Sequence, residues 1–217
     1  TLGGLLLQYQ PWPAIFLALA GYALLVLIWA SLRLPESLPE VQALNIRSVA
    51  RNYRALLGHR HYMITTTASA LLYAGMIAYV SASSFVFIDM MAVPSQYFGL
   101  LFLTTVIGYV AGSGISTRLA LTRESEQVMW IGARAAVGAA VLMLLCSELW
   151  FNPASIVLPM ALFSTSLGIV LPHAMGVALR DFPHMAGTAS ALFGFLQMGV
   201  SSLGGALVGA YLHSNAR

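Results

Sequence analysis

Long apolar stretches separated by short polar segments recur along the whole chain. A helix needs about 20 mostly apolar residues to cross the hydrocarbon core of a bilayer, and each stretch is about that long. The strands of a membrane β-barrel would instead alternate in polarity over about 10 residues, and no stretch follows that pattern. The pattern therefore predicts an all-α, polytopic membrane helical bundle with spans near 12–32, 62–86, 97–117, 128–148, 155–178 and 187–212.

The composition agrees with a bilayer environment. Hydrophobic residues make up 59% of the chain and charged residues only 8%, and the mean hydropathy is +0.82. A soluble domain carries about 25% charged residues. Residues 1–9 are apolar but too short to cross, so we expect them to be the last turns of an earlier helix, and we expect no signal peptide.

The positive charges are all arginines, and they are distributed unevenly between the loops. The opposite loops carry Asp89, Glu148 and only the terminal Arg217. By the positive-inside rule, the arginine-rich loops are expected in the cytoplasm. These charges flank spans and form no stacking platform, so we expect no nucleic-acid binding. The arginines of the alternate loops are Arg33, Arg47, Arg51, Arg54, Arg60, Arg118, Arg123 and Arg180.

The segment 33–61 has its own organisation. Pro35 and Pro39 end the first helix, and Asn45 is a plausible N-cap for a second one. We expect a basic amphipathic helix on the membrane surface that joins two bundles, with a regulatory site as the alternative. His59 and His61 are expected to be exposed turn residues. The apolar face of this helix would carry Ile46, Val49, Tyr53 and Leu56, and the basic face Arg47, Arg51 and Arg54.

Small residues recur at spacings that allow helices to approach closely in lipid. The third span contains Gly108 and Gly112, and the sixth contains Gly205 and Gly209, each pair in a small-xxx-small arrangement. We expect these seams to pack helices within one bundle rather than to form dimers. Further close approaches are predicted at Gly132, Gly138, Gly168 and Gly176.

One face of the second span is weakly polar. Ser69, Tyr73, Met76 and Ser83 share it at helical spacing, and Gln197 in the sixth span supplies an amide at membrane depth beside Phe193. A face of hydroxyl groups, aromatic rings and a thioether suits a cavity for varied apolar ligands. Plain hydrogen bonding between helices explains these residues equally well.

Few ionisable groups lie at membrane depth, where such groups are by default functional candidates. Arg134 can snorkel to the headgroups, although a substrate or counter-ion role is the alternative. His173 follows Pro172 and can satisfy the carbonyl that the proline leaves free, or relay a proton. Asp89 ends the second span at the outer face, where a mouth position and simple solvation are the two alternatives. The only cysteine, Cys146, forms no pair, and we expect no metal and no cofactor.

Several stretches carry the motifs of one family. They are Gly3-Gly4, Trp12-Pro13-Ala14-Ile15-Phe16, Leu34-Pro35-Glu36-Ser37-Leu38, Tyr73-Ala74-Gly75-Met76 with Ser83-Ser84-Phe85-Val86, and Asp181-Phe182-Pro183-His184-Met185-Ala186-Gly187-Thr188-Ala189-Ser190. In this order they resemble the antiporter motif on helix 5, the entry to helix 6, the Pro-Glu-Ser/Thr-Leu signature, helix 7 and the segment that opens helix 11 in the bicyclomycin- and chloramphenicol-resistance (Bcr/CflA) branch of the major facilitator superfamily. Pro13 stands where that branch usually has arginine.

The resemblance covers the whole chain and implies its organisation. The chain would hold the tail of helix 5 and helices 6 to 11, without helix 12. Residues 1–32 would end the N-terminal bundle, 33–61 would form the cytoplasmic loop between the halves, and 62–217 would form the C-terminal bundle. The implied partners are the N-terminal half of the same transporter, membrane lipids, protons and a small-molecule substrate.

The resemblance also implies a function. Members of this branch export small amphipathic compounds in exchange for protons across the bacterial inner membrane, with substrate bound near the midplane between the halves. The motifs for proton coupling lie mostly on helices that this chain does not contain, so we expect the chain alone not to transport. The implied substrate-binding residues are Ser69, Tyr73, Met76, Tyr109, Phe193 and Gln197, and the candidates for proton coupling are His173, Asp89 and Arg134.

Other functions remain as alternatives. A facilitator for sugars, dipeptides or other metabolites would use several amides at depth, and this chain has almost none besides Gln197. A rhomboid-like intramembrane serine protease would use Ala111-Gly112-Ser113-Gly114 with His173, but both candidates fall toward the cytoplasmic side. A membrane receptor or scaffold without transport is the third alternative. We expect a transporter and not an enzyme.

Overall fold

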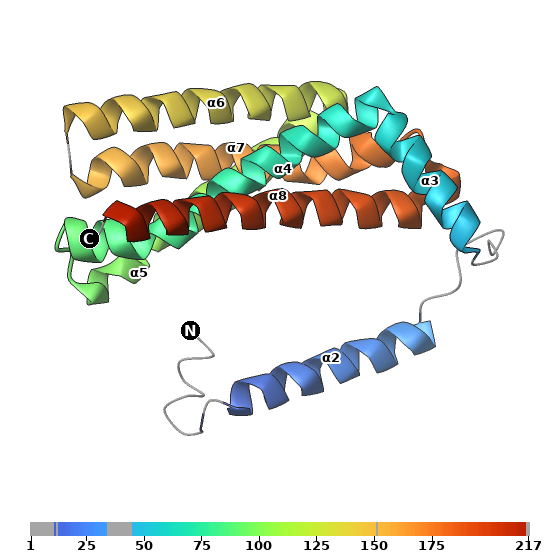
Figure 1. Cartoon of the computed structure of the whole chain (residues 1–217), viewed down its shortest axis with the longest axis horizontal. Helices are drawn as coiled ribbons and strands as arrows, with labels where there is room; N and C mark the ends of the chain where they lie inside the picture. Colours follow the sequence, from blue (N-terminus) through green and yellow to red (C-terminus); the bar gives the residue numbers. More distant parts are fainter. Residues whose placement is uncertain (1–10, 12, 34–44, 151, 216–217) are drawn as a thin grey trace. The chain divides into compact units, whose positions relative to one another are not determined.

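The computed structural model describes residues 11, 13–33, 45–150 and 152–215 (Figure 1). Gly3-Gly4, Trp12 and the segment 34–38, which carry part of the family resemblance, lie outside these residues. The chain forms two compact units, Thr1–Leu44 and Asn45–Arg217, so the basic helix belongs to the same unit as the bundle that follows it.

The described residues are helical and contain no strand, as predicted. Six helices in them are long and apolar enough to cross a membrane, and they agree with the predicted spans to within a few residues at most ends. In the first unit the only such helix is α2 (Pro13–Arg33), which is apolar all round and has no buried residue. A helix of this kind requires an apolar environment outside itself.

The second unit is a helical bundle. Its helices are α3 (Ile46–Gly58), α4 (Arg60–Ser84), α5 (Ser95–Ala120), α6 (Ser125–Leu149), α7 (Pro153–Leu179) and α8 (Ala186–Asn215). A π-helical turn, η1 (Phe85–Met90), continues α4, and a 3₁₀ turn, η2 (Pro183–Met185), precedes α8. The helix α7 is the most buried and packs against α4, α5 and α6, whereas α8 packs mainly along α4 (Figure 1).

Glycines allow α5 and α6 to approach α7 closely. A side chain at Gly108 would collide with the carbonyl oxygen of Ala161, and one at Gly112 would collide with that of Thr165. At Gly132 of α6, a Cβ atom would lie 2.7 Å from a methyl carbon of Val170. The predicted seam on the third span therefore packs two helices of the same bundle, as close approach through small residues requires.

Of the other predicted close approaches at glycines, some are confirmed and some are wrong. Gly168 packs against the backbone of α5, and Gly205 faces Ser81 of α4, where a Cβ atom would lie 3.3 Å from the Ser81 Oγ. The predicted close approaches at Gly138 and Gly176 and at Gly209, the second glycine of the sixth-span seam, are wrong, since a Cβ atom at each would meet no described atom within 4 Å. Spacing along one helix shows which residues share a face, but it does not show where the neighbouring helix crosses.

The outer surface of the bundle is largely apolar. Leucine and valine side chains stand exposed on every long helix, among them Leu71, Val110, Leu144 and Leu203. Soluble proteins rarely expose apolar patches as extensive as this surface. The exposed side chains therefore fit a bilayer as the surrounding solvent.

The basic helix α3 lies across the ends of α4 and α8 (Figure 1). It begins at Asn45, whose Oδ1 accepts a hydrogen bond from the Arg47 backbone N–H at 3.0 Å, so the predicted N-cap is confirmed. Leu56 is 0% exposed and joins the core of the bundle, whereas Arg51 and Arg54 are exposed. The predicted amphipathic helix thus turns its apolar face to the bundle.

The two histidines at the start of α4 correct an expectation. His59 caps α4 by accepting a hydrogen bond from the Tyr62 backbone N–H at 3.3 Å, and its ring stacks edge to face on Phe182. The Nε2 atom of His61 lies 3.2 Å from a carboxylate oxygen of Glu126. Both side chains are half-buried, so neither is an exposed turn residue. The contacts of His59 with Phe182 and of His61 with Glu126 join residues far apart in the sequence, which spacing does not reveal.

Candidate functional site

A polar junction joins α4 to α8 at the middle of the bundle. Ser69 of α4 is fully buried, and its Oγ accepts a hydrogen bond from the Gln197 side-chain amide of α8 at 3.4 Å. Within α8, the Ser201 hydroxyl donates a hydrogen bond to the backbone carbonyl oxygen of Gln197 at 2.6 Å. Two of the predicted substrate residues are therefore in direct contact, through the interhelical hydrogen bond that was the alternative explanation for them.

Met76 joins the same face of α4 to α7. It lies seven residues after Ser69, which is about two helical turns. The Ser164 hydroxyl of α7 is 3.9 Å from the Met76 sulfur. Tyr73 lies between Ser69 and Met76 on this face and is half-buried. We call the face formed by Ser69, Tyr73 and Met76, with Gln197 beside it, the polar seam.

The remaining two predicted substrate residues lie outside the polar seam. Phe193 is buried in the core, in one cluster with Val170 and Ala174 of α7. Tyr109 is on α5, where its carbonyl oxygen packs against Gly168 and its side chain is 39% exposed. The structure therefore joins Ser69 to Gln197 and keeps Tyr73 and Met76 on the same face of α4 as Ser69, and it does not add these two rings to them.

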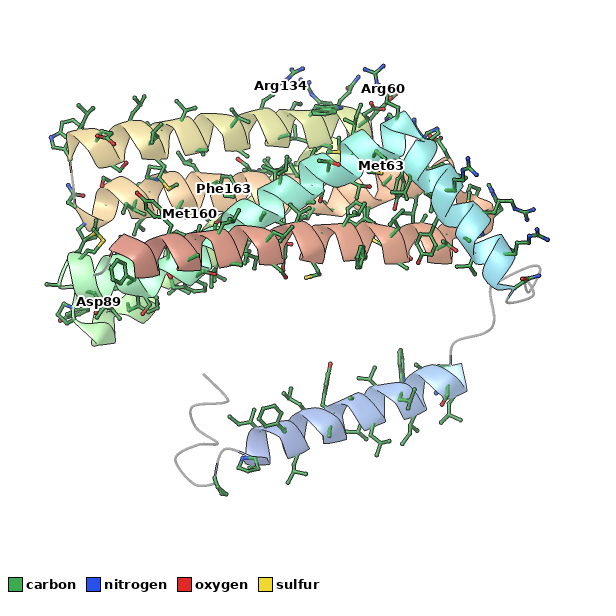
Figure 2. All side chains as sticks on the ribbon, viewed as in Figure 1. Arg60, Met63, Asp89, Arg134, Met160 and Phe163 are labelled. Atoms are coloured by element: carbon green, nitrogen blue, oxygen red, sulfur yellow. The ribbon has the colours of Figure 1, made fainter. Side chains whose placement is uncertain are left out.

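The three predicted candidates for proton coupling are far from one another. Asp89 is exposed in η1, at the opposite end of the bundle from Arg60, and Arg134 points away from the bundle on the outer side of α6 (Figure 2). His173 is half-buried in α7. None of the three has an ion-pair or side-chain hydrogen-bond partner among the described residues. Their positions do not form one site.

Several charged side chains lie together at the arginine-rich end, and the sequence pattern did not predict this group. Glu126, in the first turn of α6, accepts from His61 at 3.2 Å and lies 3.9 Å from the Arg180 guanidinium. Arg180 also approaches Asp181 at 3.7 Å. These contacts tie the start of α4, the start of α6 and the end of α7 together. Acidic residues among the loop arginines were the only signal in the sequence.

One protein-family model matches nearly the whole chain. The model of the Major Facilitator Superfamily matches residues 1–205. The chain belongs to the major facilitator superfamily. Six apolar helices fit a part of that fold, and this superfamily consists of transporters, so the comparison indicates a transporter and not an enzyme.

Individual relatives of this major facilitator chain are more distant. An uncharacterized MFS-type transporter of Bacillus subtilis is 30% identical over 94% of the chain and 52% of its own length. The bicyclomycin resistance protein homolog of Haemophilus influenzae is 26% identical over 95% of the chain and 52% of its own length. Multidrug resistance protein D of Escherichia coli is 28% identical over 90% of the chain and 49% of its own length. The chain thus spans about half the length of the curated relatives it matches, and the predicted resemblance to bicyclomycin-resistance transporters is confirmed.

Proposed function

We propose that this chain is part of a secondary active transporter that exports small amphipathic compounds from bacteria in exchange for protons. The protein lies in the inner membrane with its arginine-rich end in the cytoplasm, which follows from the positive-inside rule. The substrate binds near the midplane and contacts the C-terminal bundle along the polar seam. Residues 33–61 form the loop between the two halves of the transporter.

The polar seam is the observation that carries this proposal, because its side chains are weakly polar and uncharged. It offers a hydroxyl, a phenol, a thioether and a single amide, with Ser69 and Gln197 already bonded to each other. A ligand with many hydroxyl groups would need many partners, because each unpaired polar group costs free energy in a dry site. A largely apolar ligand needs few. The names of two relatives, a bicyclomycin resistance homolog and multidrug resistance protein D, support the same class of cargo.

Proton exchange requires an ionisable residue within the membrane. Among the described residues of the spans, His173, Asp89 and Arg134 are the candidates, and we favour His173 because it alone is half-buried at membrane depth. A coupling residue in the other half of the transporter would make all three dispensable. Uptake assays with a His173→Gln variant separate these cases.

Drug susceptibility of efflux-deficient bacteria that express the intact gene tests the proposal. We expect resistance to amphenicol- or bicyclomycin-like compounds, loss of export in the presence of an uncoupler, and weaker resistance for Tyr73→Ala and Gln197→Ala. Tyr97→Ala is the matched control, because this exposed tyrosine lies at the start of α5 outside the polar seam. Normal membrane expression without protection against any compound would refute drug export and favour a metabolite carrier.

A further inference from the structure

Tyr79 of α4 has a buried hydroxyl group without a partner. The residue is 9% exposed, and its phenolic oxygen is buried with no hydrogen-bond partner among the described residues. A buried tyrosine hydroxyl usually finds a partner, since leaving it unpaired costs the full desolvation penalty of the group. The position therefore suits a tyrosine that bonds to something other than the described residues.

Aromatic rings and thioethers surround Tyr79 together with a few aliphatic side chains. Phe87 stacks edge to face on the Tyr79 ring, with the centroids 6.4 Å apart. Methionine side chains are flexible and polarizable, so they repack readily around an aromatic guest. The cluster contains no charged side chain, so it favours an uncharged ligand. Besides Tyr79, its aromatic and methionine side chains are Met76, Phe87, Met91, Phe98, Phe102, Met160 and Phe163. We call this cluster the Tyr79 compartment.

Met76 makes the Tyr79 compartment continuous with the polar seam. It belongs to both, since it packs in the cluster with Tyr79 and also accepts the contact from Ser164 at 3.9 Å. Its position three residues before Tyr79 places the two side chains on adjacent parts of one helix face. Met76 is therefore the side chain that the polar seam and the Tyr79 compartment share.

Phe163 bounds the compartment on the side of α7, where Figure 2 shows it close to Met160. The tip of its ring takes the space that a side chain at residue 75 would fill, since a Cβ atom on Gly75 would lie 2.9 Å from the Phe163 Cζ. Gly75 thus gives this ring room that any other residue would remove.

From these observations we infer that the Tyr79 compartment is a subsite for an uncharged aromatic group that carries a hydrogen-bond acceptor. The guest ring packs among Met76, Met160 and Phe163, and the Tyr79 hydroxyl donates to its acceptor. The inference rests on the proposed export function and adds the chemical class of the substrate to it. Tyr79 acts as a residue of specificity, since a ring without an acceptor would leave the hydroxyl unpaired.

Direct binding to the purified full-length transporter tests the inference. The probes are radiolabelled chloramphenicol, an uncharged aromatic ring with acceptors, and radiolabelled naphthalene, an uncharged aromatic hydrocarbon without an acceptor. For Tyr79→Phe we expect the Kd of chloramphenicol to rise roughly threefold to tenfold, as for one lost hydrogen bond, and the Kd of naphthalene to stay unchanged. Tyr97→Phe, a matched change at an exposed tyrosine, should change neither Kd.

The outcomes separate the inference from the proposed function. If the unmodified transporter binds neither probe, drug export fails together with the subsite. If it binds chloramphenicol and Tyr79→Phe binds equally well, the subsite alone is wrong and the hydroxyl has an ordinary structural role. If Tyr79→Phe weakens the binding of both probes equally, the inferred hydrogen bond is also wrong. Should Tyr79→Phe not fold, Gly75→Ala tests the compartment independently, because it crowds the Phe163 ring and should weaken binding of chloramphenicol; unchanged binding there refutes the subsite.

Discussion

Replacing Gly112 of α5 by alanine tests how the bundle is held together. The added Cβ atom would overlap the carbonyl oxygen of Thr165 and lie 2.8 Å from its carbonyl carbon and 3.0 Å from its Cα. All three atoms belong to the backbone of α7, so no change of rotamer relieves the collision. The two helices must therefore separate along the seam.

The size of the effect follows from two opposing contributions. Overpacking of a tightly packed site typically costs about 1–3 kcal/mol, and here the rigid backbone of Thr165 places the cost at the upper end. Alanine favours a helix over glycine by roughly 1 kcal/mol, which opposes this cost. Gly114 provides the matched control on the same helix, because a Cβ atom there would meet no described atom within 4 Å.

The assay is the apparent midpoint of thermal unfolding of the purified full-length transporter in detergent. We expect Gly112→Ala to lower the midpoint by several degrees and Gly114→Ala to leave it unchanged or raise it slightly. Equal midpoints for the two variants would refute the argument, because only the contact with α7 distinguishes these two glycines. A loss of folded protein for Gly112→Ala alone agrees with it.

Three further predictions concern the arginine-rich end and use the same thermal assay. Leu56→Ala should destabilise the protein by about 2–5 kcal/mol, because the side chain is 0% exposed, whereas Leu57→Ala, at 51% exposure, should have little effect. Equal effects would show that α3 is not docked through Leu56. Tyr62→Phe removes a hydrogen bond of 2.7 Å to the Ala189 carbonyl oxygen and should cost about 0.5–1.5 kcal/mol; an unchanged midpoint contradicts that bond. Glu126→Gln should cost less than about 1 kcal/mol, since its ion pairs are partly exposed, and a larger loss would mean that they act as a buried network.

Much of the fold could be predicted because the bilayer imposes strong constraints on a sequence. The length and apolarity of each span, the N-cap at Asn45 and the two faces of α3 are local properties, and the structure confirms them. The glycine pair at Gly108 and Gly112 was also readable, since in lipid only small residues let helix backbones touch. The polar seam followed in part, because Ser69, Tyr73 and Met76 share a face through helical spacing alone.

Only the tertiary structure decided which faces meet. Phe193 and Gln197 lie one turn apart on α8, yet the first is buried in the core and the second bonds to Ser69. His61 and Glu126 are 65 residues apart and meet at 3.2 Å, and the lone hydroxyl of Tyr79 becomes visible only when its neighbours are known. The helical period determines the direction in which each side chain points from the axis of its own helix, whereas contacts between helices depend on how their axes cross. The sequence by itself determined the helices and their environment, and the packing of α4, α7 and α8 determined the site.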